Sequence, residues 1–264
     1  MLLLAILLLL CLVGANNLMS LFFAVGGFSI TLYVLVLFDV YTRVSREAAM
    51  KYFYLSTISA GFIIFGTFLL YFSAGTAMFS ELRWVFLTVV HLDLSIASAA
   101  LLFIILGLFF KLSAFPAHLW AVEVYEGSPA PVLAFFLLPV KVAVLVTFAR
   151  LLNTAFIGLA DYWLPCVAVA CAGSLLWGAF AALYERKISR FLGYASINQL
   201  GYLLMGIACD TDEALRSMYG YLVPYVMMSG GFLFIYMHTR RKGALNMLYI
   251  SDFRGFAVQE RVLS

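Results

Sequence analysis

Two lysines, Lys111 and Lys141, lie within otherwise apolar segments of the chain. A charged side chain in the hydrocarbon core of a membrane costs roughly 2.5–3.5 kcal/mol on insertion scales, so such residues usually have a function. Burial in a low-dielectric medium disfavours the charged form of an amine, which allows the amine to gain and lose a proton near neutral pH. The pair therefore predicts a proton path inside a membrane, with the lysines as its titrating groups.

Each lysine also has a purely structural interpretation. Lys111 lies close to a predicted helix break, and its amine could reach the membrane surface while its methylenes stay buried. Lys141 is far from both ends of its apolar segment, and its amine could bond a backbone carbonyl instead. A proton relay and these structural roles both remain open at the level of sequence.

A proline marks the break between the two lysines. The apolar run 94–122 would extend over about 40 Å as a single helix, whereas the hydrocarbon core is about 30 Å thick. Pro116 lacks the N–H that would bond the carbonyl of Leu112, next to Lys111. Broken helices at membrane depth are tolerated where protein buries them or where they line a hydrated cavity, and their loose carbonyls often handle ions.

His118, Glu123 and Glu126 follow the proline. His118 could pass a proton between this loop and Lys111, or it could be a packed histidine with a satisfied nitrogen. The two glutamates could form an entry funnel for protons, although solvated loop charges are the simpler interpretation. Ser196 and its polar neighbours in the later span 191–209 could hold water or bond adjacent helices.

The composition is that of an all-α polytopic membrane protein. The 264 residues are 65% hydrophobic and 11% charged, whereas soluble domains are about half apolar and a quarter charged. Eight transmembrane spans are predicted, at about 1–14, 18–38, 52–73, 94–122, 131–152, 162–184, 191–209 and 215–237. A loop is expected between the third span and the fourth. No basic stripe on a polar face suggests a nucleic-acid partner.

The basic residues of the links predict the orientation. Links after even-numbered spans hold nine of them: Arg43, Arg46, Lys51, Arg186, Lys187, Arg190, Arg240, Arg241 and Lys242. Links after odd-numbered spans hold three: Arg83, Arg150 and Arg216. The positive-inside rule therefore places both termini on the cytoplasm-like side, which is the matrix side in a mitochondrion.

The sequence contains no metal-ligand cluster, phosphate-binding loop, haem ligand pair or hydrolase triad. We therefore expect no metal, no bound cofactor and no redox centre in this chain. All acidic residues fall in links, at span ends or in the tail, so neither lysine has an acidic partner at mid-membrane within the chain.

The segment FKLSAFPAHLWAVEVYEGSPAPV resembles the signature FKLxxxPFHxWxPDVYEGAPTPV of subunit 2 of respiratory complex I, the proton-pumping NADH:ubiquinone oxidoreductase. Further similar segments are ANNLMSLFFAVGGFSITLYVL, REAAMKYFYLS, RFLGYASINQLGYLLMG and SDFRGF. The resemblance covers essentially the whole chain. It implies an antiporter-like fold of two inverted five-helix repeats, each with a broken helix, as in Mrp-type cation/proton antiporters.

By this resemblance, Lys111 is the broken-helix lysine and Lys141 the central lysine of the next helix, and both carry protons. Gly26 occupies the position at which the family carries a glutamate, the usual partner of the broken-helix lysine. The resemblance assigns residues 1–152 to a complete first repeat with a broken helix near Pro116, residues 153–242 to a truncated second repeat and residues 243–264 to an interfacial tail. A separate polypeptide is expected to supply the remaining helices.

The expected function is that of a proton-translocating membrane-arm subunit of complex I, coupled to distant quinone reduction. The alternatives are a structural scaffold that no longer pumps and a subunit of an Mrp-type antiporter. The resemblance implies FMN, iron–sulfur clusters and ubiquinone in the complex, and other membrane-arm subunits and lipids such as cardiolipin as partners. The mitochondrial inner membrane is the expected location, because no transit peptide accompanies the high hydrophobicity; a bacterial plasma membrane is the alternative.

Overall fold

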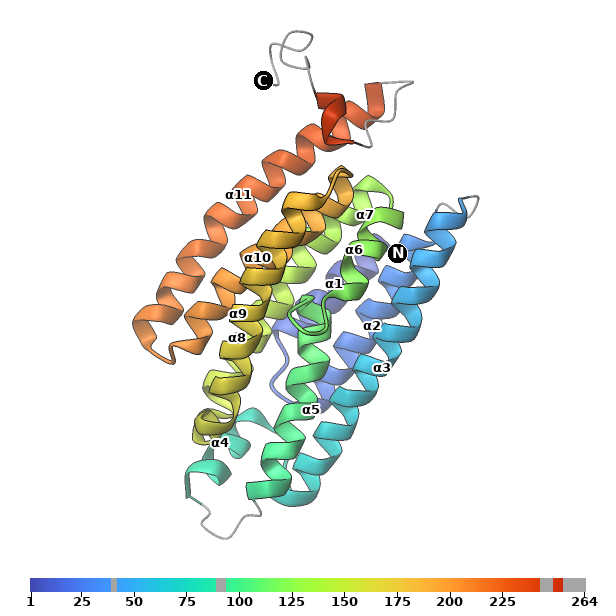
Figure 1. The fold of residues 1–264 in the computed structure, drawn as a ribbon. Helices are drawn as coiled ribbons and strands as arrows, with labels where there is room; N and C mark the ends of the chain where they lie inside the picture. The colour runs from blue at the N-terminus through green and yellow to red at the C-terminus, as the bar shows by residue number, and fades with distance from the viewer. Residues whose placement is uncertain (39–41, 89–93, 243–248, 254–264) are drawn as a thin grey trace.

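The protein is a bundle of long helices in a computed structural model that describes residues 1–38, 42–88, 94–242 and 249–253. No strand occurs in these ranges. The longer helices run roughly side by side, and α11 lies along one side of the bundle (Figure 1). The helical elements are α1 Leu2–Val13, α2 Leu18–Val36, α3 Arg43–Ala74, α4 Phe79–Thr88, α5 Leu94–Leu112, α6 Leu119–Gly127, α7 Ala130–Phe135, η1 Phe136–Val140, α8 Lys141–Thr154, η2 Ile157–Leu159, α9 Ala160–Tyr184, α10 Ile188–Ala208, α11 Asp212–Lys242 and η3 Ile250–Phe253.

All eight predicted spans correspond to helices, and six helical segments in the described ranges are long and apolar enough to cross a membrane. These six are Leu18–Val36, Arg43–Ala74, Leu94–Leu112, Ala130–Thr154, Ile157–Tyr184 and Asp212–Met237. The predicted first span is the shorter helix α1, of 12 residues. The predicted seventh span is α10, which carries the polar group around Ser196 and is not among these six. The chain is therefore membrane-embedded and all-helical.

Two local features, α4 and the end of α8, differ from the sequence-based expectations. The segment expected to be a loop before Leu94 contains α4, because Phe79 and Leu82 are buried on one face of this short helix. Helix α8 continues to Thr154, two residues past the predicted end of the fifth span. Most of the expected tail, 243–264, lies outside the described residues, but Ile250 in η3 donates its N–H to the carbonyl of Arg186 at 2.9 Å.

Two glycines allow α3 and α5 to pack closely. A Cβ atom at Gly66 would lie 2.6 Å from the carbonyl oxygen of Ala100, and one at Gly107 would lie 2.8 Å from the carbonyl oxygen of Ser59. Small residues at helix interfaces let backbones approach in this way in membranes. The close contact matters for function because α3 carries Ser56 and α5 carries Lys111, and these two side chains bond each other.

This packing predicts a difference between two glycines of the same helix. Gly66→Ala should destabilise the protein by about 1–3 kcal/mol, because the new methyl group collides with backbone that cannot move alone. Gly61→Ala should be neutral or slightly stabilising, since nothing lies within 4 Å of its added Cβ and alanine favours the helix. Denaturant titration in detergent measures both. Equal stabilities of the two variants would contradict the close α3–α5 contact.

Candidate proton-transfer site

The helix break lies between Leu112, where α5 ends, and Leu119, where α6 begins. Ser113 adopts a left-handed conformation with φ of 58°, and the Phe115–Pro116 peptide bond is cis. The Leu112 carbonyl, expected to be free, accepts the hydroxyl of Ser113 at 2.5 Å. The N–H of Phe115 donates to Ser174 of α9 at 3.0 Å. Polar groups at the break are thus partly satisfied by side chains, as burial requires.

Lys111 is buried in the bundle, with 4% of its surface exposed. Its amine donates to the hydroxyl of Ser29 on α2 at 2.8 Å and to the hydroxyl of Ser56 on α3 at 2.5 Å. The Ser29 hydroxyl in turn donates to the carbonyl of Val25 at 2.5 Å. The amine therefore does not reach the surface of the bundle. Its hydrogen-bond partners among the described residues are neutral oxygens, and the ring centres of Phe28 and Phe110 lie 5.8 and 5.6 Å from it.

A cavity of about 170 Å³ lies beside these hydroxyls, with Ser29, Ser56, Thr57 and Gly26 in its lining. Such a volume accommodates several water molecules. A Cβ atom at Gly26 would meet nothing within 4 Å, so the position at which the resemblance places a glutamate is open space here. The cavity therefore offers a polar approach to the Lys111 amine through two serine hydroxyls.

Lys141 follows directly after a π-helical turn, η1, which contains Pro139. Such turns arise where the regular hydrogen-bond pattern is interrupted, and they are frequent at functional sites. The Tyr225 hydroxyl of α11 donates to the carbonyl of Leu137 in this turn at 2.6 Å. Lys141 is also 4% exposed, and its amine donates to the Ser196 hydroxyl of α10 at 2.8 Å. The alternative interpretation of Lys141 had its amine bonded to a backbone carbonyl, but the acceptor in the structure is the Ser196 hydroxyl.

The two lysines share one arrangement. Each amine donates to a serine hydroxyl that itself donates to a carbonyl of its own helix: Ser29 to Val25, and Ser196 to Gly193 at 2.7 Å. A narrow cavity beside Lys141, with Ser196 and Tyr225 in its lining, has room for about one water molecule. Both sites can therefore hold an amine that changes its protonation state while keeping the same acceptor.

A layer of packed aromatic side chains is formed by residues of α3, α6 and η1, the turn that precedes Lys141. The rings of Tyr52 and Trp120 are 5.3 Å apart, those of Tyr52 and Phe136 are 5.4 Å apart, and those of Tyr125 and Phe136 are 5.6 Å apart. Tyr52 also lies beneath the Lys111 amine, with 6.0 Å to its ring centre. The two amines bond different helices, α2 and α3 for Lys111 and α10 for Lys141, so no direct contact joins them.

His118 is 2% exposed and stacks on Phe115, with 5.6 Å between ring centres. The indole ring of Trp177 on α9 lies edge-on at 5.5 Å. Neither imidazole nitrogen has a hydrogen-bond partner within the described part of the chain. The histidine therefore packs toward α9, away from the serines that hold Lys111, and its two unpaired nitrogens call for water or another polar group.

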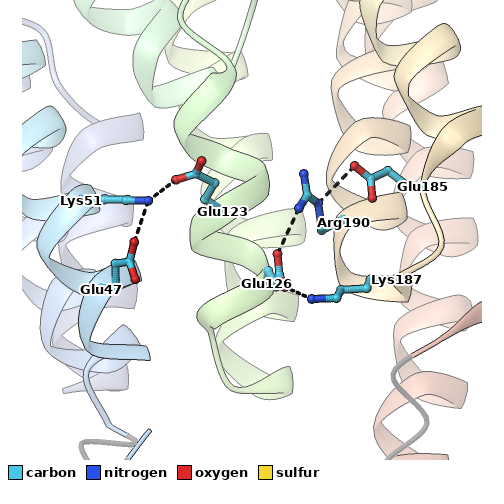
Figure 2. A network of polar contacts seen from close by, with 7 residues as sticks. All are labelled: Glu47, Lys51, Glu123, Glu126, Glu185, Lys187 and Arg190. Carbon is cyan, nitrogen blue, oxygen red and sulfur yellow. Dashed lines mark hydrogen bonds and ion pairs between the residues drawn. The ribbon is translucent and has the colours of Figure 1, made fainter. Parts of the chain in front are cut away.

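Glu123 and Glu126 do not form a funnel. They lie on different sides of α6 and bind basic residues of the neighbouring helices (Figure 2). Glu123 pairs with Lys51 of α3 at 2.6 Å, and Glu126 pairs with Lys187, in the turn before α10, at 2.5 Å. Arg190 bridges Glu126 and Glu185 at 3.5 and 3.1 Å. These pairs tie the second half of the broken helix to α3 and α10.

The ion pair between Lys187 and Glu126 changes the pKa of the lysine. The hydrogen bond to Glu126 raises the pKa of Lys187, and the attraction between the two charges adds to this effect. About half of the Lys187 side chain is exposed, so solvent screens the pair. Its main effect is to orient α6 rather than to add much stability.

Sequence reasoning missed Ser29, Ser56 and Tyr225. Serines in apolar spans usually bond their own helix, so no pattern distinguished these two from Ser59 or Ser98. Pro139, two positions before Lys141, was the available sign of an irregular turn next to the central lysine. No group of three His, Cys, Asp or Glu side chains able to hold a metal occurs among the described residues.

The sequence matches the family described as "NADH:quinone oxidoreductase/Mrp antiporter, TM" over residues 15–264. The chain belongs to this family. It is 36% identical to NADH-quinone oxidoreductase subunit N of Rhodospirillum rubrum over 252 residues. This aligned region covers 96% of this chain and 51% of that protein. The chain thus spans about half the length of the curated relatives it matches.

Solved structures share the fold. A chain of respiratory complex I from Thermus thermophilus, with bound aureothin, superposes with a TM-score of 0.81 at 25% identity, covering 98% of this chain and 55% of that one. A chain of the Mrp complex from Dietzia sp. superposes with a TM-score of 0.74 at 20% identity, covering 83% of this chain and 40% of that one. The antiporter-like fold of the family therefore accounts for almost the whole chain.

The hydrogen bonds of Lys111 to Ser29 and Ser56 predict a difference in the free energy of unfolding between two serine variants. Ser56→Ala should lower the free energy of unfolding by about 1–3 kcal/mol, because a buried amine loses its shortest hydrogen bond. Ser59→Ala should cost less, since the Ser59 hydroxyl bonds only a carbonyl of its own helix. Thermal or denaturant unfolding in detergent compares the two. Similar losses in both variants would mean that Ser56 does not support Lys111.

Proposed function

We propose that this chain is a proton-translocating subunit of the membrane arm of an NADH:quinone oxidoreductase, of the subunit N or subunit 2 type. The observation that carries the proposal is the burial of Lys111 and Lys141, whose amines donate hydrogen bonds to serine oxygens. A buried amine without a carboxylate is inexpensive to deprotonate, because its charged form has lost hydration and gains little in return. Such a group suits repeated loading and release of a proton.

In this proposal, protons reach Lys111 from the cavity lined by Ser29 and Ser56, and leave Lys141 through the narrow cavity beside Ser196. Transfer between the lysines requires water to enter the aromatic layer of Tyr52, Trp120, Tyr125 and Phe136. His118, with two unpaired nitrogens, is a further proton acceptor where the broken helix meets α9. The aromatic layer would act as a gate, because a dry layer prevents protons from leaking.

The rest of the assembly follows from the same proposal. Redox chemistry would take place on other subunits, with FMN, iron–sulfur clusters and ubiquinone, and neighbouring membrane-arm subunits would be the partners. The relatives described above are bacterial, which favours a bacterial plasma membrane over a mitochondrial inner membrane. The division into a first repeat to residue 152 and a partial second repeat, and a separate polypeptide that completes the latter, stay predictions.

Two other functions have specific support. A scaffold that fills the membrane arm without pumping is favoured by the aromatic layer, which separates the two lysines. A subunit of a cation/proton antiporter is favoured by the similarity of fold to a chain of an Mrp complex. NADH-driven proton pumping by the assembly would separate the antiporter from the other two functions. The effect of Lys141→Met on that pumping would separate the pumping subunit from the scaffold.

Lys141→Met should leave assembly intact and lower the number of protons pumped per NADH, because the thioether fills similar space but cannot carry a proton. Proton uptake by proteoliposomes that contain the assembled complex measures this ratio against NADH oxidation. Lys51→Met is the matched control, since it removes a lysine that is exposed and paired with Glu47 and Glu123. An unchanged ratio in Lys141→Met would defeat the pumping role and favour the scaffold.

Gly26→Glu should place a carboxylate in the cavity beside Ser29 and Ser56, where a side chain has room. The carboxylate would stabilise the charged amine of Lys111, so the pH profile of pumping should move to higher pH. Gly26→Gln, of nearly the same size but neutral, should leave the profile close to that of the parent protein. Identical profiles for the glutamate and glutamine variants would show that this cavity does not communicate with Lys111.

A further inference from the structure

A third cavity, of about 650 Å³, lies at the opposite end of the bundle from the α9–α10 turn (Figure 1). The turn between α1 and α2, the start of α4 and the last turns of α8 form its walls, and it is open to the surface. Backbone bonds hold these walls together: the N–H of Leu18 donates to the carbonyl of Ala77 at 3.0 Å, and that of Phe79 donates to the carbonyl of Asn16 at 3.1 Å. None of the residues that line it is acidic.

Arg150 forms one side of this cavity and is fixed in place. Its guanidinium donates to the carbonyls of Val13 at 2.7 Å and Ala15 at 3.1 Å and to the side chain of Asn16, and it lies 6.0 Å from the ring centre of Phe79. All these partners are neutral. A guanidinium has five N–H donors, and the three bonds leave two of them, and the full positive charge, available to a ligand.

Arg83 supplies a second guanidinium to the same cavity. It is exposed and forms no hydrogen bond or ion pair with any described residue. Glu81 lies close in sequence but does not line the cavity. Two guanidiniums without a carboxylate, together with the Ser80 hydroxyl, form a group of donors with positive charge. This chemistry is selective for an anion, and the planar guanidinium matches the geometry of phosphate oxygens.

The surface next to the cavity is apolar. Trp84 is 65% exposed and Leu87 59% exposed on α4, and Met78 at the rim of the cavity is 51% exposed. Tryptophan is enriched at the membrane–water interface, where its ring sits at headgroup level. An anion bound here would therefore lie at the depth of phosphate groups, with apolar side chains beside it for acyl chains.

We propose that this cavity binds the phosphate of an anionic phospholipid, with Arg83 and Arg150 as its ligands. The site goes beyond proton translocation and lies apart from both lysines. A free phosphate ion has the same charge chemistry, but it would gain nothing from the exposed side chains of Trp84 and Leu87. A zwitterionic lipid is disfavoured, because its cationic group would face two guanidiniums.

The test measures binding of short-chain phosphatidylglycerol, phosphatidylcholine and inorganic phosphate to the purified assembly that contains this chain, by native mass spectrometry in detergent. Phosphatidylglycerol should bind more tightly than the other two probes. Arg83→Gln should weaken phosphatidylglycerol binding about tenfold, the effect of losing one charge-assisted hydrogen bond. Because Arg83 is exposed and unbonded, this variant should fold normally. Ser80→Ala should weaken binding less.

Arg216→Gln is the matched control, because it removes an exposed arginine near the start of α11, outside the cavity. Phosphatidylglycerol binding in this variant should equal that of the parent protein. Equal losses in Arg83→Gln and Arg216→Gln would overturn the proposal and indicate a general charge effect. Binding of inorganic phosphate as tight as that of phosphatidylglycerol would also overturn it, in favour of a free-phosphate site.

Discussion

The architecture depends on how a membrane bundle buries two ammonium groups without a carboxylate. Lys111 and Lys141 are both nearly inaccessible, and each donates to serine oxygens. Hydroxyls satisfy the hydrogen bonds of an amine but do little to offset the loss of hydration of its charge. The charged and neutral forms are therefore closer in free energy than they would be in an ion pair, and this near balance is the property that a proton carrier needs.

The broken helix makes this burial possible. By ending α5 at Leu112, the chain places Lys111 in the last turn of a helix whose neighbour α3 approaches closely at Gly66 and Gly107. The second half, α6, is oriented by the ion pairs of Glu123 with α3 and of Glu126 with the turn before α10 (Figure 2). Glu123 and Glu126 thus form ion pairs that connect helices, whereas the buried amines of Lys111 and Lys141 bond serine hydroxyls.

The separation of the two lysines has a physical consequence for any transport through this chain. Each amine has a cavity of its own, and the rings of Tyr52, Trp120, Tyr125 and Phe136 pack together, with Tyr52 beside Lys111 and Phe136 in the turn before Lys141. In the function proposed above, this layer would act as a gate, and its opening would be the step that a distant reaction controls. At the other end of the bundle, Arg150 of α8 donates to the carbonyls of Val13 and Ala15 and so holds the α1–α2 turn against α8.

The sequence by itself determined the class of protein, the helical spans, the break near Pro116 and the two amines, because hydropathy, proline and charge act locally along the chain. It could not determine what those amines touch. Ser29, Ser56 and Ser196 lie 82, 55 and 55 positions from their lysines, and only the packing of helices brings them together. The same holds for the partners of Glu123 and Glu126 and for the cavity of Arg83 and Arg150, since contacts between distant segments depend on which helix faces meet.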